Sequence, residues 1–276
     1  MKGAVVSGEM KTMALALAYN GEGFSGFAKQ KDEGIRTVQG CLEQALKTVF
    51  RREIETICAG RTDAGVHALG QVVSFALTPD EAAGLTSRRL LISLNAITDD
   101  DITVKQAVWA PDDFSARFDA QWREYRYRIC VGSIPPQFLS KVAWWHKSQL
   151  DVDAMKQAAT YLIGENDFKS FCKKASSVDK TTMRCVRSID LFEEEHLGEM
   201  CLVIKVIGNA FLHSMVRTIV GTLVEVGVGR KQPEWVGEVL AAKNRDAAGP
   251  NAPACGLTFW CVDYGDIAFE EMNAEG

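Results

Sequence analysis

The stretch EIETICAGRTDAGVHALGQVVSFAL, residues 53–77, decides the fold of this chain because it joins two apolar segments through a short polar turn. Residues 53–59 and 70–77 are rich in β-branched and apolar side chains, which favours strands. Between them, the Thr-Asp-Ala-Gly segment is good turn chemistry, since Gly65 can take positive φ without strain. The sequence therefore predicts two strands whose connecting turn carries Asp63.

A strand and a helix precede this hairpin, and a helix and a strand follow it. Residues 13–19 form a short apolar run that ends in an Asn-Gly turn signal, as a buried strand does. Apolar residues recur at helical spacing over 38–50, with Thr37 as a plausible N-cap. Residues 86–97 are predicted as a second helix and 101–110 as a closing strand. The predicted order is βαββαβ.

The second half of the chain repeats this order with different residues. Strands are predicted at 122–131, 183–194, 199–207 and 257–264, and helices at 152–164, 211–227 and 233–243. The repetition predicts an α+β fold of two tandem ferredoxin-like βαββαβ units. Their antiparallel or mixed sheets would lie side by side and leave a central cleft. We expect an N-terminal domain over residues 1–114 and a C-terminal domain over 115–276.

Composition limits the partners and the compartment. The 276 residues carry a formal net charge of −5, so a surface for nucleic acid must be local or assembled from two subunits. The eight cysteines show no Cys-x-x-Cys spacing, which predicts buried thiols of a reducing compartment. No apolar run approaches the roughly 20 residues of a membrane span. The N-terminus lacks the apolar core of a signal peptide, so we expect a cytoplasmic protein.

Asp63 has two interpretations on the residues alone. It can serve the turn, by bonding to nearby backbone groups. Arg61 lies two residues away, however, and a guanidinium can keep a carboxylate charged and oriented even in a desolvated pocket. An aspartate is ionised at neutral pH, so it can act as a nucleophile without an activating base. The pair therefore makes this turn a candidate catalytic loop.

Seven ordered blocks carry a family resemblance that runs from about Leu15 to Tyr264. They are YNGEGFSGFAKQ, TVQG, AGRTDAGVHALGQVVSF, DDFSARF, REYRYRI, GENDFKSF and NAFLHSMVRTIVGTLVEVG. Together they resemble the TruA family of tRNA pseudouridine synthases, which act on the anticodon stem-loop. Asn20 and residues 27–30 depart from the usual family pattern, outside the catalytic set.

This resemblance implies an isomerase that converts uridine to pseudouridine at positions 38, 39 and 40 of tRNA. The N-glycosidic bond breaks, and C5 of the uracil rejoins the ribose C1′. The resemblance implies no cofactor, no metal and no nucleotide cofactor. It makes Asp63 the catalytic residue, either by attack on C1′ or by another route.

The resemblance also implies four substrate-binding residues. Tyr125 would stack on the target base and help to take the C5 proton, although an inward-facing strand tyrosine is also a common core residue. Arg217 would pair with the catalytic carboxylate, which suits an arginine set among apolar residues of a helix. Arg61 would hold the everted nucleotide, since the base must leave the stacked stem to react. Leu257 would line the uracil pocket, or be ordinary core.

RNA phosphates require basic side chains, and one loop of the second half supplies them. The candidates for contact with the RNA backbone are Lys169, Lys173, Lys174 and Arg184. A solvated loop is the alternative. The family also implies a homodimer, in which two acidic chains assemble one shared basic groove.

Two histidines lie near the candidate site residues in the sequence, and two other functions are to be weighed against the isomerase. We expect a structural hydrogen bond for His67, and His213 is a candidate neighbour of the catalytic pair because it lies one helical turn before Arg217. A non-catalytic RNA-binding module would bind RNA through a ferredoxin-like sheet without forming product. A hydrolase using Asp63 as a covalent nucleophile is disfavoured, because the same block holds no phosphate-cradling glycine loop and no separate general acid.

Overall fold

The structure is a computed structural model, and it describes residues 9–32, 34–173 and 181–265. The strands are β1 (Lys11–Tyr19), β2 (Ile57–Cys58), β3 (His67–Leu77), β4 (Ile102–Ala110), β5 (Trp122–Val131), β6 (Trp144–His146), β7 (Gly164–Asp167), β8 (Met183–His196), β9 (Glu199–Gly208) and β10 (Leu257–Asp263). The α-helices are α1 (Val38–Phe50), α2 (Pro79–Ala82), α3 (Ser87–Asn95), α4 (Val152–Ala159), α5 (Met215–Gly227) and α6 (Trp235–Ala242).

All the strands belong to one mixed sheet. Its order is β4-β1-β3-β10-β5-β9-β8-β7, with β2 paired to β3 and β6 paired to β5. We expected two sheets side by side; instead β10 joins the halves edge to edge. It runs antiparallel to β5 and parallel to β3, where Thr258 pairs with His67 and Phe259 with Ala68. The last strand of the chain therefore fixes the first half against the second.

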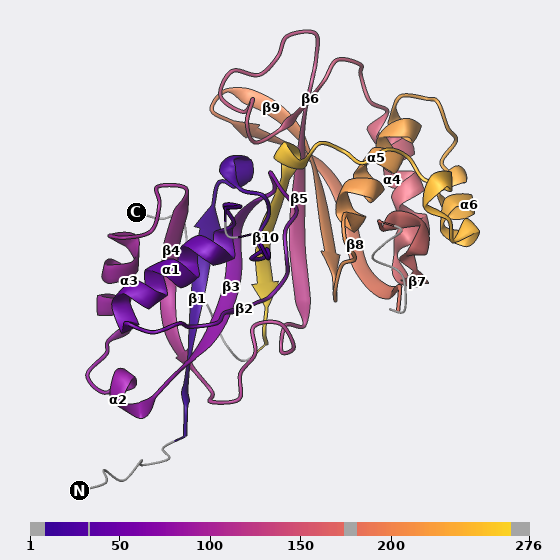
Figure 1. The fold of residues 1–276 in the computed structure, drawn as a ribbon. Coiled ribbons are helices and arrows are strands. Elements are labelled where there is room, and N and C mark those ends of the chain that lie inside the picture. The colour runs from indigo at the N-terminus through magenta and orange to yellow at the C-terminus, as the bar shows by residue number, and fades with distance from the viewer. Residues whose placement is uncertain (1–8, 33, 174–180, 266–276) are drawn as a thin grey trace, which may run out of the picture.

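Each half of the sheet has its own group of helices. Figure 1 shows α1 and α3 lying across β1, β3 and β4, and α4, α5 and α6 gathered beside β8 and β7. This arrangement confirms the predicted α+β class. The apolar faces of the helices and of the sheet meet in one large core that runs through both halves. A small second cluster, made of Cys130, Leu139, Ala143 and Cys201, lies at one end of β5 and β9.

Most predicted elements are confirmed, and two boundaries differ for identifiable reasons. The strand expected over 53–59 is reduced to β2, because the backbone N–H of Thr56 donates to the Glu43 carboxylate of α1 at 3.0 Å. The helix expected from residue 211 begins at Met215, because Ser214 takes a left-handed conformation. The short strands β6 and β7 were not anticipated.

The burial of the cysteines and the apolarity of the helices can be compared with what the composition predicted. Of the eight cysteines, only Cys130, Cys172 and Cys201 are buried, and Cys261 is exposed. The expectation of uniformly buried thiols was therefore wrong for five of them. Within the part of the chain that the structure describes, no helix has the length and apolarity needed to cross a membrane.

Candidate active site

Asp63 stands at the first position of a tight turn between β2 and β3. The backbone N–H of Val66 donates to the Asp63 carbonyl at 3.1 Å, and Gly65 has φ 78°. A glycine with positive φ at the third position is what a type II turn requires. The turn therefore accounts for the Thr-Asp-Ala-Gly sequence and presents Asp63 with 23% of its side chain exposed.

Hydrogen bonds hold this turn on both sides. The backbone N–H of Phe27 donates to the Thr62 carbonyl at 3.0 Å, and the Thr62 hydroxyl meets the Tyr19 hydroxyl at 2.7 Å. On the other side, the Gln71 amide donates to the Gly60 carbonyl at 2.6 Å. A loop fixed at so many points keeps the Asp63 side chain in place without help from a ligand.

Arg123 of β5 anchors the base of the same loop. Its buried guanidinium donates to the Ala59 carbonyl from Nε at 3.2 Å and from Nη2 at 3.1 Å. It also donates to the carbonyls of Arg117, Ala120 and Asn209, at 2.7, 2.8 and 2.5 Å. Burial lowers the pKa of Arg123, but a guanidinium stays charged at neutral pH. One side chain thus ties the loop to the segments before β5 and after β9.

Three side chains from the start of α5 surround the Asp63 carboxylate. Arg217 Nη1 lies 3.3 Å from Oδ2, and the Ser214 hydroxyl donates to the same oxygen at 2.8 Å. His213 Nε2 lies 3.3 Å from Oδ1. The structure therefore brings together Asp63 and Arg217, which lie 154 residues apart and which the family resemblance paired.

Arg217 is itself held by the segment that leads into β10. Its Nε donates to the Ala252 carbonyl at 2.8 Å, and the Ala252 N–H donates back to the Arg217 carbonyl at 3.0 Å. This approach needs a glycine on α5, since a Cβ at Gly221 would lie 1.8 Å from the Pro250 carbonyl oxygen. The ion pair, the hydrogen bonds to Ala252 and the close packing at Gly221 therefore fix the position of the Arg217 guanidinium.

Tyr125 is buried between two aromatic rings near the loop. Its ring centroid lies 5.0 Å from that of Phe211 and 4.9 Å from that of Phe259, both edge to face. Burial, with the Asp63 charge adding to it, raises the pKa of Tyr125 well above its ordinary value. The phenol is therefore protonated at neutral pH. Leu257, also buried, begins β10 opposite Tyr127 in the register.

The remaining predicted residues are in different surroundings. Arg61 is exposed and makes no hydrogen bond or ion pair to another described residue. Lys169 and Lys173 are exposed, whereas Arg184 is half-buried, with its Nη1 donating to the carbonyls of Thr181 and Met183. Lys174 lies outside the described residues.

His67 has a structural role, as the sequence predicted. It is buried, and its Nδ1 accepts a hydrogen bond from the Gly21 N–H at 3.1 Å. Nδ1 is therefore unprotonated, and burial lowers the pKa of His67. A histidine held neutral in this way fixes the entry to β3.

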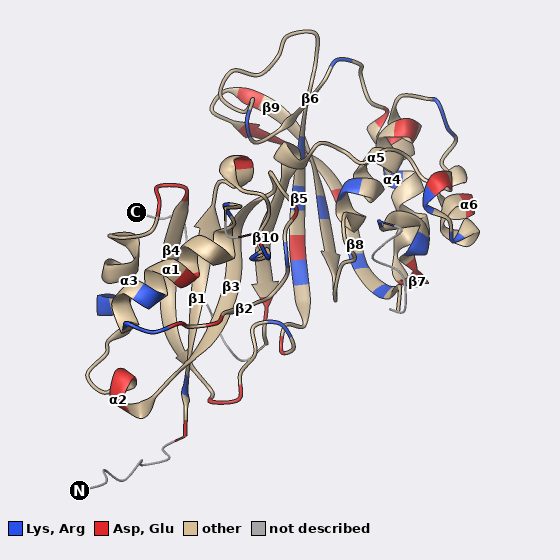
Figure 2. Ribbon diagram, in the orientation of Figure 1, with Lys and Arg blue, Asp and Glu red and all other residues tan. Residues whose placement is uncertain are grey.

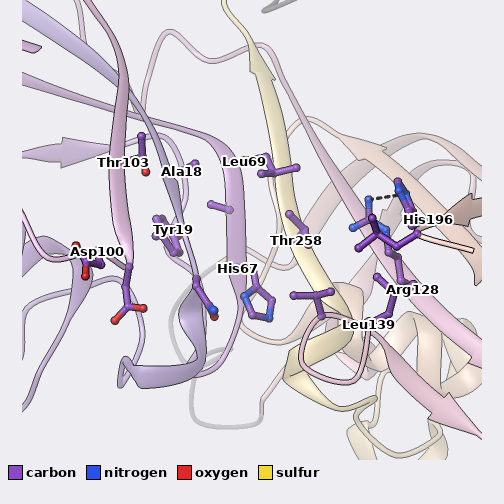
Figure 3. A pocket seen from close by; sticks show the side chains of 15 residues that line it. Ala18, Tyr19, His67, Leu69, Asp100, Thr103, Arg128, Leu139, His196 and Thr258 are labelled. Carbon is purple, nitrogen blue, oxygen red and sulfur yellow. Dashed lines mark hydrogen bonds between the residues drawn. The ribbon is translucent and has the colours of Figure 1, made fainter. Parts of the chain in front are cut away.

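A separate cavity of about 440 Å³ lies beyond His67 (Figure 3). Arg128, Leu139 and His196 line it on the side of the second half, and Ala18 and Thr103 on the side of the first. None of the predicted site residues is in its lining, so this cavity is distinct from the surroundings of Asp63.

Sequence reasoning missed two residues of the site. Arg123 falls in phase with Tyr125 and Tyr127 along β5, so strand alternation alone places a charged side chain on a buried face. This alternation could have identified Arg123 from the sequence. Ser214 offered a weaker one, because it was placed inside the helix expected from residue 211.

The chain is similar to known proteins along most of its length. The family described as tRNA pseudouridine synthase matches residues 15–119 and 158–265. The chain is 44% identical over 255 residues to tRNA pseudouridine synthase A of Brevibacillus brevis, covering 92% of this chain and 100% of the relative. It is 41% identical over 253 residues to the protein of the same name in Thermotoga neapolitana, covering 92% and 99%.

Among solved structures, a chain from a crystal structure of a Cbf5-Nop10-Gar1 complex matches with a TM-score of 0.32 and 12% identity, over 76% of this chain and 54% of that one. The family match includes Asp63 in its first block and Arg217 in its second, whereas Tyr125 lies between the two blocks. Together with the relatives aligned along nearly their full length, it shows that this chain belongs to the tRNA pseudouridine synthase family.

Proposed function

We propose that this chain isomerises uridine to pseudouridine at positions 38, 39 and 40 in the anticodon stem-loop of tRNA. The observation that carries the proposal is the ion pair between Asp63, on its fixed turn, and Arg217 of α5. A partly exposed carboxylate held by a guanidinium is suited to chemistry on a bound nucleotide. The curated relatives named tRNA pseudouridine synthase A support the substrate and the reaction.

The reaction balances without any other reactant. The bond from N1 to C1′ breaks, a bond from C5 to C1′ forms, the C5 hydrogen leaves as a proton, and N1 ends protonated. Asp63 acts either by attack on C1′ or by another route, and both require the carboxylate to be charged. Arg217 and the Ser214 hydroxyl hold that carboxylate in place through their hydrogen bonds to Oδ2.

The target base must leave the stacked stem before it can reach Asp63. We assign Arg61 to the everted nucleotide, because it is exposed and lies two residues from Asp63. Tyr125 and Leu257 are assigned to the base. The raised pKa of Tyr125 keeps its phenol protonated and favours packing against uracil over accepting the C5 proton.

We assign phosphate contacts to Lys169, Lys173, Lys174 and Arg184. The exposure of Lys169 and Lys173 supports this assignment, and Figure 2 shows basic residues on the end of β8 that adjoins β7. The hydrogen bonds of Arg184 to the carbonyls of Thr181 and Met183 leave it less available than the two lysines. We further propose a homodimer, since a chain of net charge −5 gains a continuous basic groove only when two copies combine their local patches.

We also propose a finer description of the fold, which the strand order supports. The sheet order is β4-β1-β3-β2 in the first half and β10-β5-β9-β8 in the second. When the strands of each half are counted along the chain, leaving aside the short β6 and β7, both orders read fourth, first, third and second strand. This repetition supports two tandem ferredoxin-like units with domains at 1–114 and 115–276. We place the cleft for RNA where Asp63 and Arg217 meet. A tRNA substrate also supports a cytoplasmic location for the protein.

Incubation with unmodified tRNA tests the proposed function directly. Chemical labelling of pseudouridine, followed by mapping, is expected to show product at positions 38, 39 and 40 wherever the tRNA has uridine there. The control is a tRNA with cytidine at these three positions, which should give no product in the stem-loop. Absence of product from every uridine-bearing tRNA, or product confined to other sites, would contradict the proposal.

The affinity for tRNA is expected to fall steeply with salt. If four basic side chains contact phosphates, the dissociation constant should rise roughly 50-fold between about 50 mM and about 200 mM salt, because bound counterions are released on association. Lys169→Ala and Lys173→Ala should each reduce the slope by about one. Lys156→Ala, an exposed change on α4, serves as the control. A flat salt dependence would refute the phosphate contacts.

A further inference from the structure

The residue just before α5 has a backbone conformation that is unusual for the start of a helix. Ser214 has φ 61° and ψ 12°, in the left-handed region that L-residues avoid. Arg51, Leu197 and Lys243 are the other described non-glycine residues with positive φ. Arg51 and Lys243 follow the last turns of α1 and α6, where this conformation commonly ends a helix. Leu197 lies between β8 and β9.

The Ser214 hydroxyl also departs from its usual task at this position. A serine before a helix normally accepts a hydrogen bond from the backbone N–H two or three residues later. Thr37, Thr86 and Asp151 do so at the starts of α1, α3 and α4. Ser214 makes no such bond, and its hydroxyl donates to Asp63 Oδ2 at 2.8 Å. The strained backbone thus turns a capping residue toward the carboxylate.

The two donors on Oδ2 come from one helical turn. Ser214 and Arg217 both reach that oxygen, at 2.8 and 3.3 Å. Two directed hydrogen bonds fix the rotation of a carboxylate, which one ion pair does not. Oδ1 lies instead beside His213, whose side chain is 45% exposed. Of the two carboxylate oxygens of Asp63, Oδ1 is therefore the one on the more exposed side.

We infer that Ser214 is a positioning residue that orients the Asp63 carboxylate so that Oδ1 faces the reacting nucleotide. The inference rests on the proposed function for its catalytic consequence. Its structural part, the coupling of Ser214 to Asp63 through a strained backbone, is independent of the substrate. A residue in this role acts on turnover and leaves RNA affinity unchanged, because it contacts Asp63 and not the phosphate surface.

Three substitutions at this position separate the hydroxyl from the backbone strain. Ser214→Ala removes the hydroxyl and keeps the strain, and Ser214→Gly removes both. Ser214→Asn keeps a donor in a residue that tolerates the left-handed region. We expect kcat to fall about tenfold in the alanine and glycine variants alike, with KM unchanged, and to recover at least in part in the asparagine variant. The Tm of the glycine variant should exceed that of the alanine variant by about 2 °C.

Thr86→Ala is the matched control, since it removes a hydroxyl that caps α3 by accepting from the Arg89 N–H. It should lower Tm with kcat unchanged. Unchanged kcat in the alanine and glycine variants, or a rise in KM alone, would overturn the inference.

A double-mutant cycle on Tm distinguishes this failure from that of the proposed function. The loss of Tm caused by Ser214→Ala should shrink when Asp63 is already alanine. If the wild-type enzyme forms no pseudouridine, the proposed function fails, and the cycle still measures the coupling. Fully additive losses of Tm would overturn the coupling whatever the activity.

Discussion

Replacing Asp63 by asparagine is expected to lower kcat for pseudouridine formation roughly 10⁴-fold, the scale on which enzymes lose a residue that acts directly on substrate. Asparagine has nearly the same shape, and its carbonyl oxygen can still accept the Ser214 hydrogen bond. It has no negative charge, however, so it can neither attack C1′ nor stabilise positive charge on the ribose. The dissociation constant for tRNA should stay within about threefold, because the phosphate contacts are unchanged.

The measurement is single-turnover formation of pseudouridine at saturating enzyme, with tRNA binding measured in parallel. Asp112→Asn is the matched control, since Asp112 is an exposed carboxylate that pairs with Lys11. That variant should retain wild-type kcat. An Asp63→Asn enzyme whose rate stays within tenfold of wild type would remove Asp63 from the chemistry, and a non-catalytic RNA-binding function would predict binding by both variants with no product from either.

Local signals made much of the first half predictable. Thr37 caps α1 by accepting from the Gly40 N–H at 3.2 Å, as its place before an amphipathic run predicted. The turn that carries Asp63 follows from Gly65, whose position in the sequence requires no knowledge of the rest of the chain. Signals of this kind depend on residues within a few positions of one another, so they can be recognised in the sequence without knowledge of the tertiary structure.

The joining of the halves depended on contacts with no local signal. β10 meets β3 through Thr258 with His67 and Phe259 with Ala68, pairs separated by most of the chain. Apolar alternation predicts that residues 257–264 form a strand but gives no partner for it. The family resemblance, and not periodicity, paired Asp63 with Arg217. The role of Ser214 was unpredictable for a related reason, since a left-handed conformation at the start of α5 depends on how the preceding segment packs.

The partners of Arg123 also have no local signal in the sequence. All its acceptors are backbone carbonyls, which every residue has, so a sequence cannot identify them. Arg123→Met should lower the free energy of unfolding by about 4 kcal/mol, because methionine fills similar volume and leaves four carbonyls, those of Ala59, Arg117, Ala120 and Asn209, without this donor. Urea denaturation followed by circular dichroism measures the loss.

Arg123→Lys and Arg187→Met make the expectation specific to the planar guanidinium. A lysine ammonium has three donors on a single nitrogen and cannot reach carbonyls on opposite sides of the fork, so it should recover less than half of the lost stability. Arg187 is an exposed arginine of β8, and its change to methionine should cost under about 0.5 kcal/mol. If Arg123→Met costs no more than Arg187→Met, the loop that carries Asp63 is held by Gln71 and Thr62 instead, and its rigidity owes nothing to β5.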